Sequence, residues 1–284
     1  SEKLKQEAQK KLAEKIRKFN VTLLSIGNGT ASYETEQFAS KMIEEEKLDC
    51  HYIITNEAGA SVYSASKLAI DELPDLDVTI RGAVSIARRV QDPLAESVKI
   101  DPKSIGVGQY QHDVNQKQLT HTLDQVVESV VNHVGVELNT ASPAILQHIA
   151  GISGTVAKNI VAFRQENGGF TSRKQLLKVP RLGPAAFTQC AGFLRLNGAK
   201  NPLDNTSVHP ESYELAERII GELGFTLKDL QDKSQLEALQ VKLPLVDVDK
   251  MAHKLDAGIP TVRDIIAALA KPGRDPREDL PAPL

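Results

Sequence analysis

Aromatic residues are scarce in this chain of 284 residues: tryptophan is absent, and aromatic side chains make up only 4% of the sequence. Proteins that bind single-stranded nucleic acid without sequence preference stack successive bases on aromatic side chains. A stacking platform of this kind is therefore not expected within the chain.

Cysteine is also rare, because Cys50 and Cys190 are the only two in the sequence and no CxxC pair exists. This spacing excludes a secreted disulfide framework and argues against a structural zinc site. The sequence also lacks both an apolar run near the length of a membrane span and a signal peptide. We therefore expect a soluble protein without membrane contact, cytoplasmic or, in a eukaryotic source, nuclear.

Acidic residues are nearly missing from residues 139–200, although the whole chain has a formal net charge of −3. The segment has one acid, Glu166, against eight basic residues: Lys158, Arg164, Arg173, Lys174, Lys178, Arg181, Arg195 and Lys200. Its formal charge is therefore +7, which leaves −10 for the rest of the chain. A basic island in an acidic chain indicates a binding site for a polyanion.

The same segment contains one pattern twice, thirty residues apart. Residues 149–154 (IAGISG) align with residues 179–184 (VPRLGP), and the offset also pairs apolar positions: Leu146 with Leu176, Ile160 with Cys190 and Phe163 with Phe193. Each copy has an apolar helical run, a turn rich in Gly or Pro, and a second apolar run. The pattern predicts one helix–turn–helix unit used twice, each copy burying the other's apolar face.

Both turns resemble those of the tandem helix-hairpin-helix module, whose hairpin reads hydrophobic-x-Gly-hydrophobic-Gly. The first copy has Ser153 at the second glycine, and the second copy has Arg181 at the first. The resemblance implies that backbone amides at the start of the second helix hold a phosphate. It implies these nucleic-acid-binding residues: Gly151, Ile152, Ser153, Gly154, Thr155, Lys158, Lys178, Arg181, Leu182, Gly183 and Ala185. The alternative is a plain helical-hairpin scaffold.

The first 74 residues alternate helical and strand patterns, with strands expected at 21–26 and 52–55 and helices at 1–18, from Ser32 to about 47, and at 61–73. This alternation is typical of a parallel α/β sheet. Two strands do not complete such a sheet, so we expect its first strands to lie outside this sequence. Gly27-x-Gly29-x-x-Ser32 is close to a dinucleotide fingerprint but lacks the third glycine and a well-placed acid, so no cofactor is expected.

Residues 75–138 read as mainly helical, with breaks at prolines. Arg81, Arg88 and Arg89 either extend a basic face or pair with nearby aspartates, and an apolar stripe runs from residue 119 to 134. Beyond residue 200, we expect helices from Pro210, at 229–239 and at 262–269. The four prolines in the last 13 residues indicate a linker.

Segments such as SIGNGTASYET, EAGASVYSASKLA and KPGRDPRED closely resemble the bacterial Tex family and its eukaryotic relatives with an S1 RNA-binding domain. The resemblance runs from about residue 19 to 279. It implies a mainly α chain with a partial α/β, RNase H-like beginning. The implied domains are a partial YqgF domain (1–74), a helical connection (75–138), a tandem helix-hairpin-helix (139–200), a small helical domain (201–271) and a linker (272–284). The family's S1 domain has no match here, so we expect a central fragment.

Nuclease activity is not expected, because related nucleases hold two metal ions between several carboxylates. The two expected strands contain no acid, and Glu57 is the one candidate that follows them. The expected function is non-catalytic, sequence-independent binding of RNA or DNA in transcription or RNA metabolism, without metal or cofactor. Transcription or translation machinery are further expected partners. The alternatives are a protein-interaction scaffold, with the S1 domain outside this chain holding the nucleic acid, and a nucleotide-dependent α/β enzyme.

Overall fold

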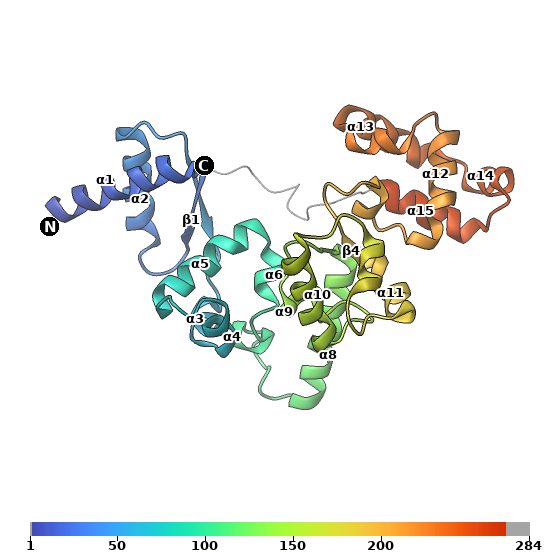
Figure 1. Ribbon diagram of the computed structural model, residues 1–284. Helices are drawn as coiled ribbons and strands as arrows, with labels where there is room; N and C mark the ends of the chain where they lie inside the picture. Colours follow the sequence, from blue (N-terminus) through green and yellow to red (C-terminus); the bar gives the residue numbers. More distant parts are fainter. Residues whose placement is uncertain (1, 271–284) are drawn as a thin grey trace. The chain divides into compact units, whose positions relative to one another are not determined.

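The computed structural model describes residues 2–270, and the linker expected at 272–284 lies outside the described residues. The chain divides into two compact units, residues 2–116 and residues 117–270. Helices dominate both units, and the described strands form two small parallel sheets (Figure 1). The expectation of a mainly α chain with an α/β beginning is therefore confirmed.

The first unit contains a parallel pair of strands, β1 (Leu23–Gly27) and β2 (His51–Thr55), in which Leu23 lies opposite His51. The crossover between them is α2 (Ser32–Glu45). Helix α1 (Glu2–Phe19) contacts α2, and Ile16, Met42 and Cys50 form a buried cluster there. Ser32 is not the cap of α2, because Ala31 occupies that position and makes no side-chain hydrogen bond to it.

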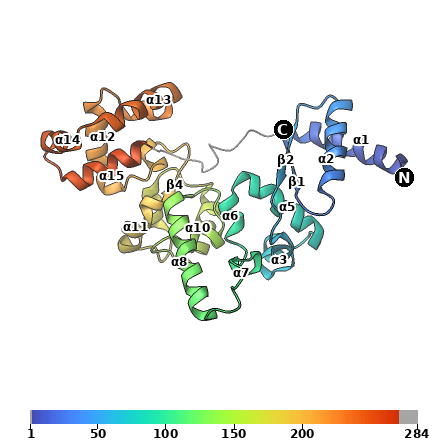
Figure 2. The same ribbon diagram turned by 180° about the vertical axis from the view of Figure 1, so that it is seen from behind.

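Helix α5 (Val78–Gln91) packs against both strands, as the view from behind shows (Figure 2). It begins at Asp77, whose carboxylate accepts hydrogen bonds from two amides of the first turn. The single helix expected at 61–73 is wrong: α3 (Ala60–Ala65) and α4 (Lys67–Glu72) are separate helices. Ser66 has extended backbone between them and caps α4 through its hydroxyl, which interrupts the helix.

Two short helices follow, α6 (Pro93–Ser97) and α7 (Pro102–Ile105), each beginning at a proline behind a capping aspartate. The three arginines of α5 form no basic face and pair with none of the nearby aspartates. Arg81 donates to the carbonyl of Ser64, Arg88 lies 3.5 Å from a carboxylate oxygen of Glu72, and Arg89 donates to the carbonyl of Asn56. These arginines hold unit 1 together.

The second unit opens with α8 (Gln116–Val134), which ends before Gly135. Its expected apolar stripe is mostly half-buried: Val126 is 53% and Val130 is 43% exposed, whereas Val131 is fully buried. Among the described residues, the stripe therefore has only partial cover.

The repeat unit follows as α9 (Pro143–Leu146), α10 (Gly154–Asn167), the 3-10 helix η1 (Arg173–Lys178), α11 (Pro184–Cys190) and η2 (Ala191–Phe193). Its aligned positions Leu146, Leu176, Ile160 and Cys190 are all fully buried. Two strands that the sequence pattern does not predict, β3 (Val136–Glu137) and β4 (Leu194–Arg195), pair in parallel and bring the two ends of the repeat together.

The last described part is a helical bundle around its own core. Its elements are η3 (Pro202–Asn205), η4 (Pro210–Ser212), α12 (Tyr213–Glu222), η5 (Leu227–Gln231), α13 (Lys233–Lys242), η6 (Leu243–Leu245), α14 (Val248–Leu255) and α15 (Ile259–Ala270). The expected helix at 229–239 is instead the end of η5 and most of α13, because Asp232 ends one and caps the other.

The buried side chain of Arg173 ties the repeat to this bundle. Its guanidinium donates to the carbonyls of Leu194 at 2.7 Å and Val208 at 2.8 Å, and to the hydroxyl of Tyr213 at 2.8 Å. It also donates to the carbonyls of Leu203 and Thr206. Arg173 is only 1% exposed, and these carbonyls and the hydroxyl of Tyr213 satisfy the donors of its buried guanidinium.

Candidate nucleic-acid interface

The first hairpin turn joins α9 to α10. Gly151 has a left-handed backbone with φ of +79°, and the buried side chain of Ile152 fixes the turn to the core. Ser153 then caps α10, since its hydroxyl accepts a hydrogen bond from the amide of Val156 at 3.3 Å. Helix α10 begins at the exposed residues Gly154 and Thr155.

The second hairpin turn has the same backbone despite its different sequence. Arg181, which aligns with Gly151, is also left-handed with φ of +66°, and the buried Leu182 aligns with Ile152. Gly183 caps α11, which begins at Pro184. Three hydrogen bonds from a backbone amide to a backbone carbonyl recur at the offset of thirty. The bond from residue 149 to 146 matches that from 179 to 176, the bond from 152 to 149 matches that from 182 to 179, and the bond from 157 to 153 matches that from 187 to 183.

Each hairpin turn packs against the second helix of the other copy. The side-chain amide of Asn159 in α10 donates a hydrogen bond to the carbonyl of Pro180 at 2.9 Å. Gln189, which aligns with Asn159, lies against Gly151, where an added Cβ would come within 2.8 Å of the Gln189 Cβ. This reciprocity at equivalent positions confirms that the repeat consists of two structural copies.

The close packing corrects the expected role of Gly151. Its missing side chain makes room for α11 rather than for a phosphate, and its left-handed backbone favours glycine. Gly183 differs, because a Cβ there would meet nothing within 4 Å. Of these two glycines, Gly183 is the one that leaves open space for a ligand.

Free amides are available at the start of both second helices. The first N–H groups of a helix have no acceptor within it, and no described residue accepts from Gly154 or Thr155. In the second copy Pro184 has no N–H, so Ala185, which is exposed, provides the first helical donor. Gly183 has no side chain to cap α11, so the amide of Ala186 also has no described acceptor, and each hairpin offers two free helical donors.

The basic island divides into surface and interior residues. Five of its eight cations are exposed and make no ion pair with a described residue: Lys158, Lys174, Lys178, Arg181 and Lys200. Arg164, Arg173 and Arg195 instead donate to backbone carbonyls inside the unit. The interpretation of the whole island as a surface footprint is wrong for these three arginines.

The interior arginines illustrate what burial does to a guanidinium. Arg164 donates to the carbonyls of Leu138 and Ala141 at 3.0 and 2.9 Å, and burial lowers its pKa. Burial, followed by the charge of Arg173, lowers the pKa of Arg195 to about 10, so Arg195 still carries its proton at neutral pH. Burial also lowers the pKa of His148, beside the first hairpin, which disfavours its cationic form at neutral pH.

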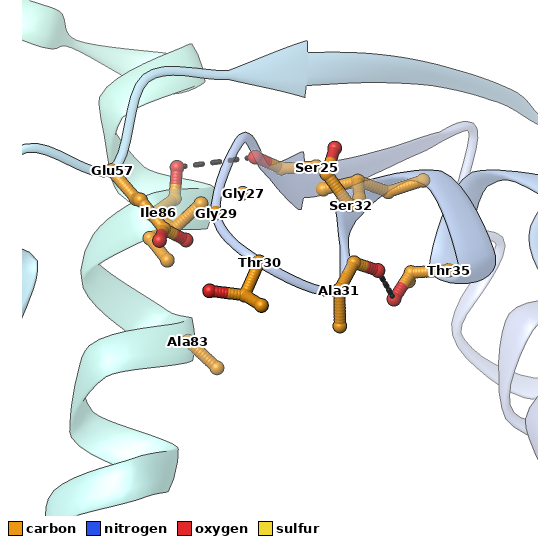
Figure 3. A pocket seen from close by; sticks show the side chains of 11 residues that line it. Ser25, Gly27, Gly29, Thr30, Ala31, Ser32, Thr35, Glu57, Ala83 and Ile86 are labelled. Atoms are coloured by element: carbon orange, nitrogen blue, oxygen red, sulfur yellow. Dashed lines mark hydrogen bonds between the residues drawn. The ribbon is translucent and has the colours of Figure 1, made fainter.

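A second candidate site lies in unit 1, where a cavity of about 400 Å³ adjoins the Gly27–Gly29 loop (Figure 3). The Glu57 side chain points into this loop, and a Cβ on either glycine would lie within about 2.2 Å of a Glu57 carboxylate oxygen. The amide of Glu57 donates to the side chain of Asn28 at 3.1 Å. A phosphate entering the loop would therefore meet a carboxylate, which disfavours a dinucleotide.

Glu57 is also the nuclease candidate, and it has no carboxylate partner in place. Groups of three or more His, Cys, Asp or Glu side chains able to hold a metal ion are absent from residues 2–270. Ser25 and Thr55, on the adjoining strands, share a hydrogen bond of 2.7 Å. The absence of nuclease activity stays a prediction. No helix within the described ranges is long and apolar enough to cross a membrane.

Four residues of the candidate interface are absent from the site residues predicted from the sequence. Lys174 and Lys200 belong to the exposed cations but not to the predicted site residues. Asn159 and Gln189 fix the two hairpins to each other, and their alignment at the offset of thirty is the signal that could have identified them.

Comparison with protein families divides the chain into three matched regions. Residues 1–91 match the Tex protein YqgF-like domain, residues 131–195 the helix-hairpin-helix motif, and residues 201–277 the HHH domain. The second region covers both hairpins. The third covers the C-terminal bundle, which the sequence analysis described only as a small helical domain.

Close relatives occur in bacteria and in animals. The chain is 58% identical over 264 residues to Protein YhgF of Escherichia coli, which covers 92% of the chain and 33% of that protein. Identity to the Transcriptional accessory protein Tex of Neisseria gonorrhoeae is 54% over 267 residues, or 94% of the chain and 34% of the relative. The human S1 RNA-binding domain-containing protein 1 is 42% identical to the chain over 315 residues, a match that covers 92% of the chain and 32% of that protein.

The chain therefore spans about a third of the length of the relatives it matches. The order of its regions agrees with the geometry described above, in which an α/β unit precedes two reciprocally packed hairpins and a helical bundle. The chain thus has a Tex YqgF-like domain followed by helix-hairpin-helix domains, and over nearly its whole length it is similar to about a third of the Tex protein.

Proposed function

We propose that the tandem hairpins bind the phosphate backbone of RNA or DNA without reading the base sequence and without catalysis. The observation that carries this proposal is the shared backbone of the two turns, each with free amides at a helix start and exposed cations nearby. The names of the relatives support a role in transcription or RNA metabolism. The transcription or translation machinery is a further partner in this proposal.

In this mechanism the amides of Gly154 and Thr155 hold one phosphate, while the helix dipole of α10 favours its negative charge. Ser153 fixes the start of that helix by its capping bond. At the second hairpin the amide of Ala185 and the side chain of Arg181 hold another phosphate, next to the open surface at Gly183.

Two lysines supplement these contacts. Lys158 lies in the first turns of α10, and Lys178 ends η1, just before the second hairpin turn. Both are exposed and form no ion pair with a described residue, so neither loses an acidic partner when it approaches a phosphate. Contacts of this kind carry no base code, so Kd values of roughly 10⁻⁴–10⁻⁶ M at physiological salt are expected.

Fluorescence anisotropy with labelled duplex DNA and single-stranded RNA over a salt series tests this proposal. Three or four phosphate contacts predict a log–log salt slope of about −3 to −4 for duplex DNA. Lys178→Gln should reduce the slope by about 1 on every sequence. Lys228→Gln, an exposed lysine of η5 outside both hairpins, is the matched control and should leave the slope unchanged. Binding that depends on one base sequence would contradict the mechanism.

A protein-interaction scaffold is the second candidate function. The exposed apolar side chains of α8, among them Val126 and Val130, favour it because such a stripe is suited to docking another protein segment. The same titration distinguishes the two. If the chain binds neither nucleic acid at low salt, the hairpins have a scaffold role and nucleic-acid binding requires a domain outside this chain.

A further inference from the structure

A cleft of about 940 Å³ lies within unit 2, at the junction of the two helix-hairpin-helix regions. One wall is formed by the end of α8, by α11 and by β4, and the other by α15. Its lining includes Asn132, Gln189, Phe193, Arg195, Asp264 and Ala267. Ligand sites prefer such junctions, and this volume lies in the range of small-molecule pockets.

Arg195 places a positive charge in the cleft, and Asp264 is the one acid among the described lining residues. Its guanidinium donates to the carbonyl of Gly192 at 2.5 Å and lies against Gly135, but it makes no ion pair with any residue between 2 and 270. Glu137 is opposite Arg195 in the β3–β4 register, yet its carboxylate accepts from the amides of Asn139 and Asn197. The carboxylate of Glu137 is therefore held by these backbone amides and forms no ion pair with Arg195.

Two residues of the cleft also contact the first hairpin. The side chain of Asn132 accepts from the amide of Ala150 at 3.1 Å and donates to the carbonyl of His148 at 3.0 Å. Gln189, on the same wall, packs against Gly151. The cleft therefore adjoins the turn that is proposed to hold a phosphate.

We propose that the cleft receives one unpaired nucleotide of a single strand whose backbone is held at the first hairpin. Phe193 offers a partly exposed ring for one base, and Arg195 offers donors to a phosphate or a base carbonyl. Gln189 provides a side-chain amide for a base edge, whereas the amide of Asn132 is already bonded to the backbone of residues 128, 148 and 150. Asp264, on the opposite wall, accepts from an exocyclic amine and disfavours a ligand that is only anionic.

This inference rests on the proposed backbone binding and adds a preference to it. A base within a duplex is paired and stacked, so it cannot enter the cleft without being extruded. The low aromatic content excludes a platform for successive bases, but a single base needs a single ring. The cleft thus predicts that single strands gain a contact that duplexes lack.

The test uses the full chain, a labelled oligodeoxycytidylate of twelve nucleotides, and a hairpin duplex in which one strand has that same sequence. Ala267 is exposed, lies on α15 and lines the cleft, so Ala267→Glu adds a carboxylate there without changing a hairpin. Ala267→Gln adds nearly the same volume without charge. Thr261→Glu places the same charge on an exposed position of α15 that is not among the cleft residues.

We expect Ala267→Glu to weaken single-strand binding about tenfold relative to Ala267→Gln, the scale of one lost base contact. Duplex binding by Ala267→Glu, and both affinities of Thr261→Glu, should stay within about twofold of wild type. Equal single-strand affinities of the Ala267→Glu and Ala267→Gln variants, or an equal loss on the duplex, would overturn the inference while backbone binding persists. Failure of the wild type to bind either probe at low salt would instead refute the proposed function.

Discussion

Replacing Arg181 by glycine should make the protein more stable while weakening its grip on nucleic acid. Arg181 has a left-handed backbone with φ of +66°, at the position where the first hairpin has Gly151. Its side chain is exposed and makes no hydrogen bond or ion pair with a described residue, so the substitution removes no such contact. The left-handed conformation costs an L-residue about 1–2 kcal/mol, and glycine avoids this cost.

Part of this gain is lost in the unfolded chain, because glycine is more flexible there by roughly 0.5–1 kcal/mol. The net expectation for Arg181→Gly is a free energy of unfolding higher by about 0–1.5 kcal/mol. Urea unfolding, followed by circular dichroism, measures this difference. Arg181→Lys is the matched control, since it keeps both the strain and the charge and should unfold at the same urea concentration as wild type.

The same pair of variants separates charge from stability in binding. Arg181→Gly should reduce the salt slope on duplex DNA by about 1 and weaken binding at low salt, whereas Arg181→Lys should bind nearly as wild type. A lower stability of Arg181→Gly would refute the strain argument. Equal binding by both variants and wild type would show that no phosphate contacts residue 181.

Three further substitutions test the packing around the interface. Arg173→Leu should lower the free energy of unfolding by about 3–5 kcal/mol, since several buried carbonyls lose their donor, whereas Lys174→Leu at the exposed neighbour should change it little in urea titrations. Gly151→Ala should lower the free energy of unfolding by about 2–4 kcal/mol, because the new side chain is strained and overlaps with Gln189. Gly183→Ala should lower it by less than about 1 kcal/mol, and thermal unfolding measures the difference between the two variants. Ser142→Ala should raise the free energy of unfolding by about 1 kcal/mol, because the buried Ser142 hydroxyl has no described hydrogen-bond partner. A melting temperature below that of the wild type would contradict this expectation.

The local chemistry of the chain was enough to locate the repeat. The periodic apolar residues, the turn residues and the offset of thirty identified both hairpins, because these features act over a few neighbouring residues. The left-handed backbone of Arg181 follows from the same alignment, since it occupies the place of Gly151. Helix boundaries were less accurate where a capping side chain such as Ser66 decided them.

Long-range contacts decided the rest. Arg173 is buried because carbonyls from residues 194 to 208 converge on it, and no pattern near residue 173 indicates this. Glu57 reaches the Gly27–Gly29 loop only because β1 and β2 pair, and the cleft at Arg195 exists only because α15 lies opposite β4. The sequence by itself thus determined the resemblance to the Tex family, the repeat and its total charge. Only the tertiary structure decided which cations reach the surface, since burial depends on which distant backbone groups surround each side chain.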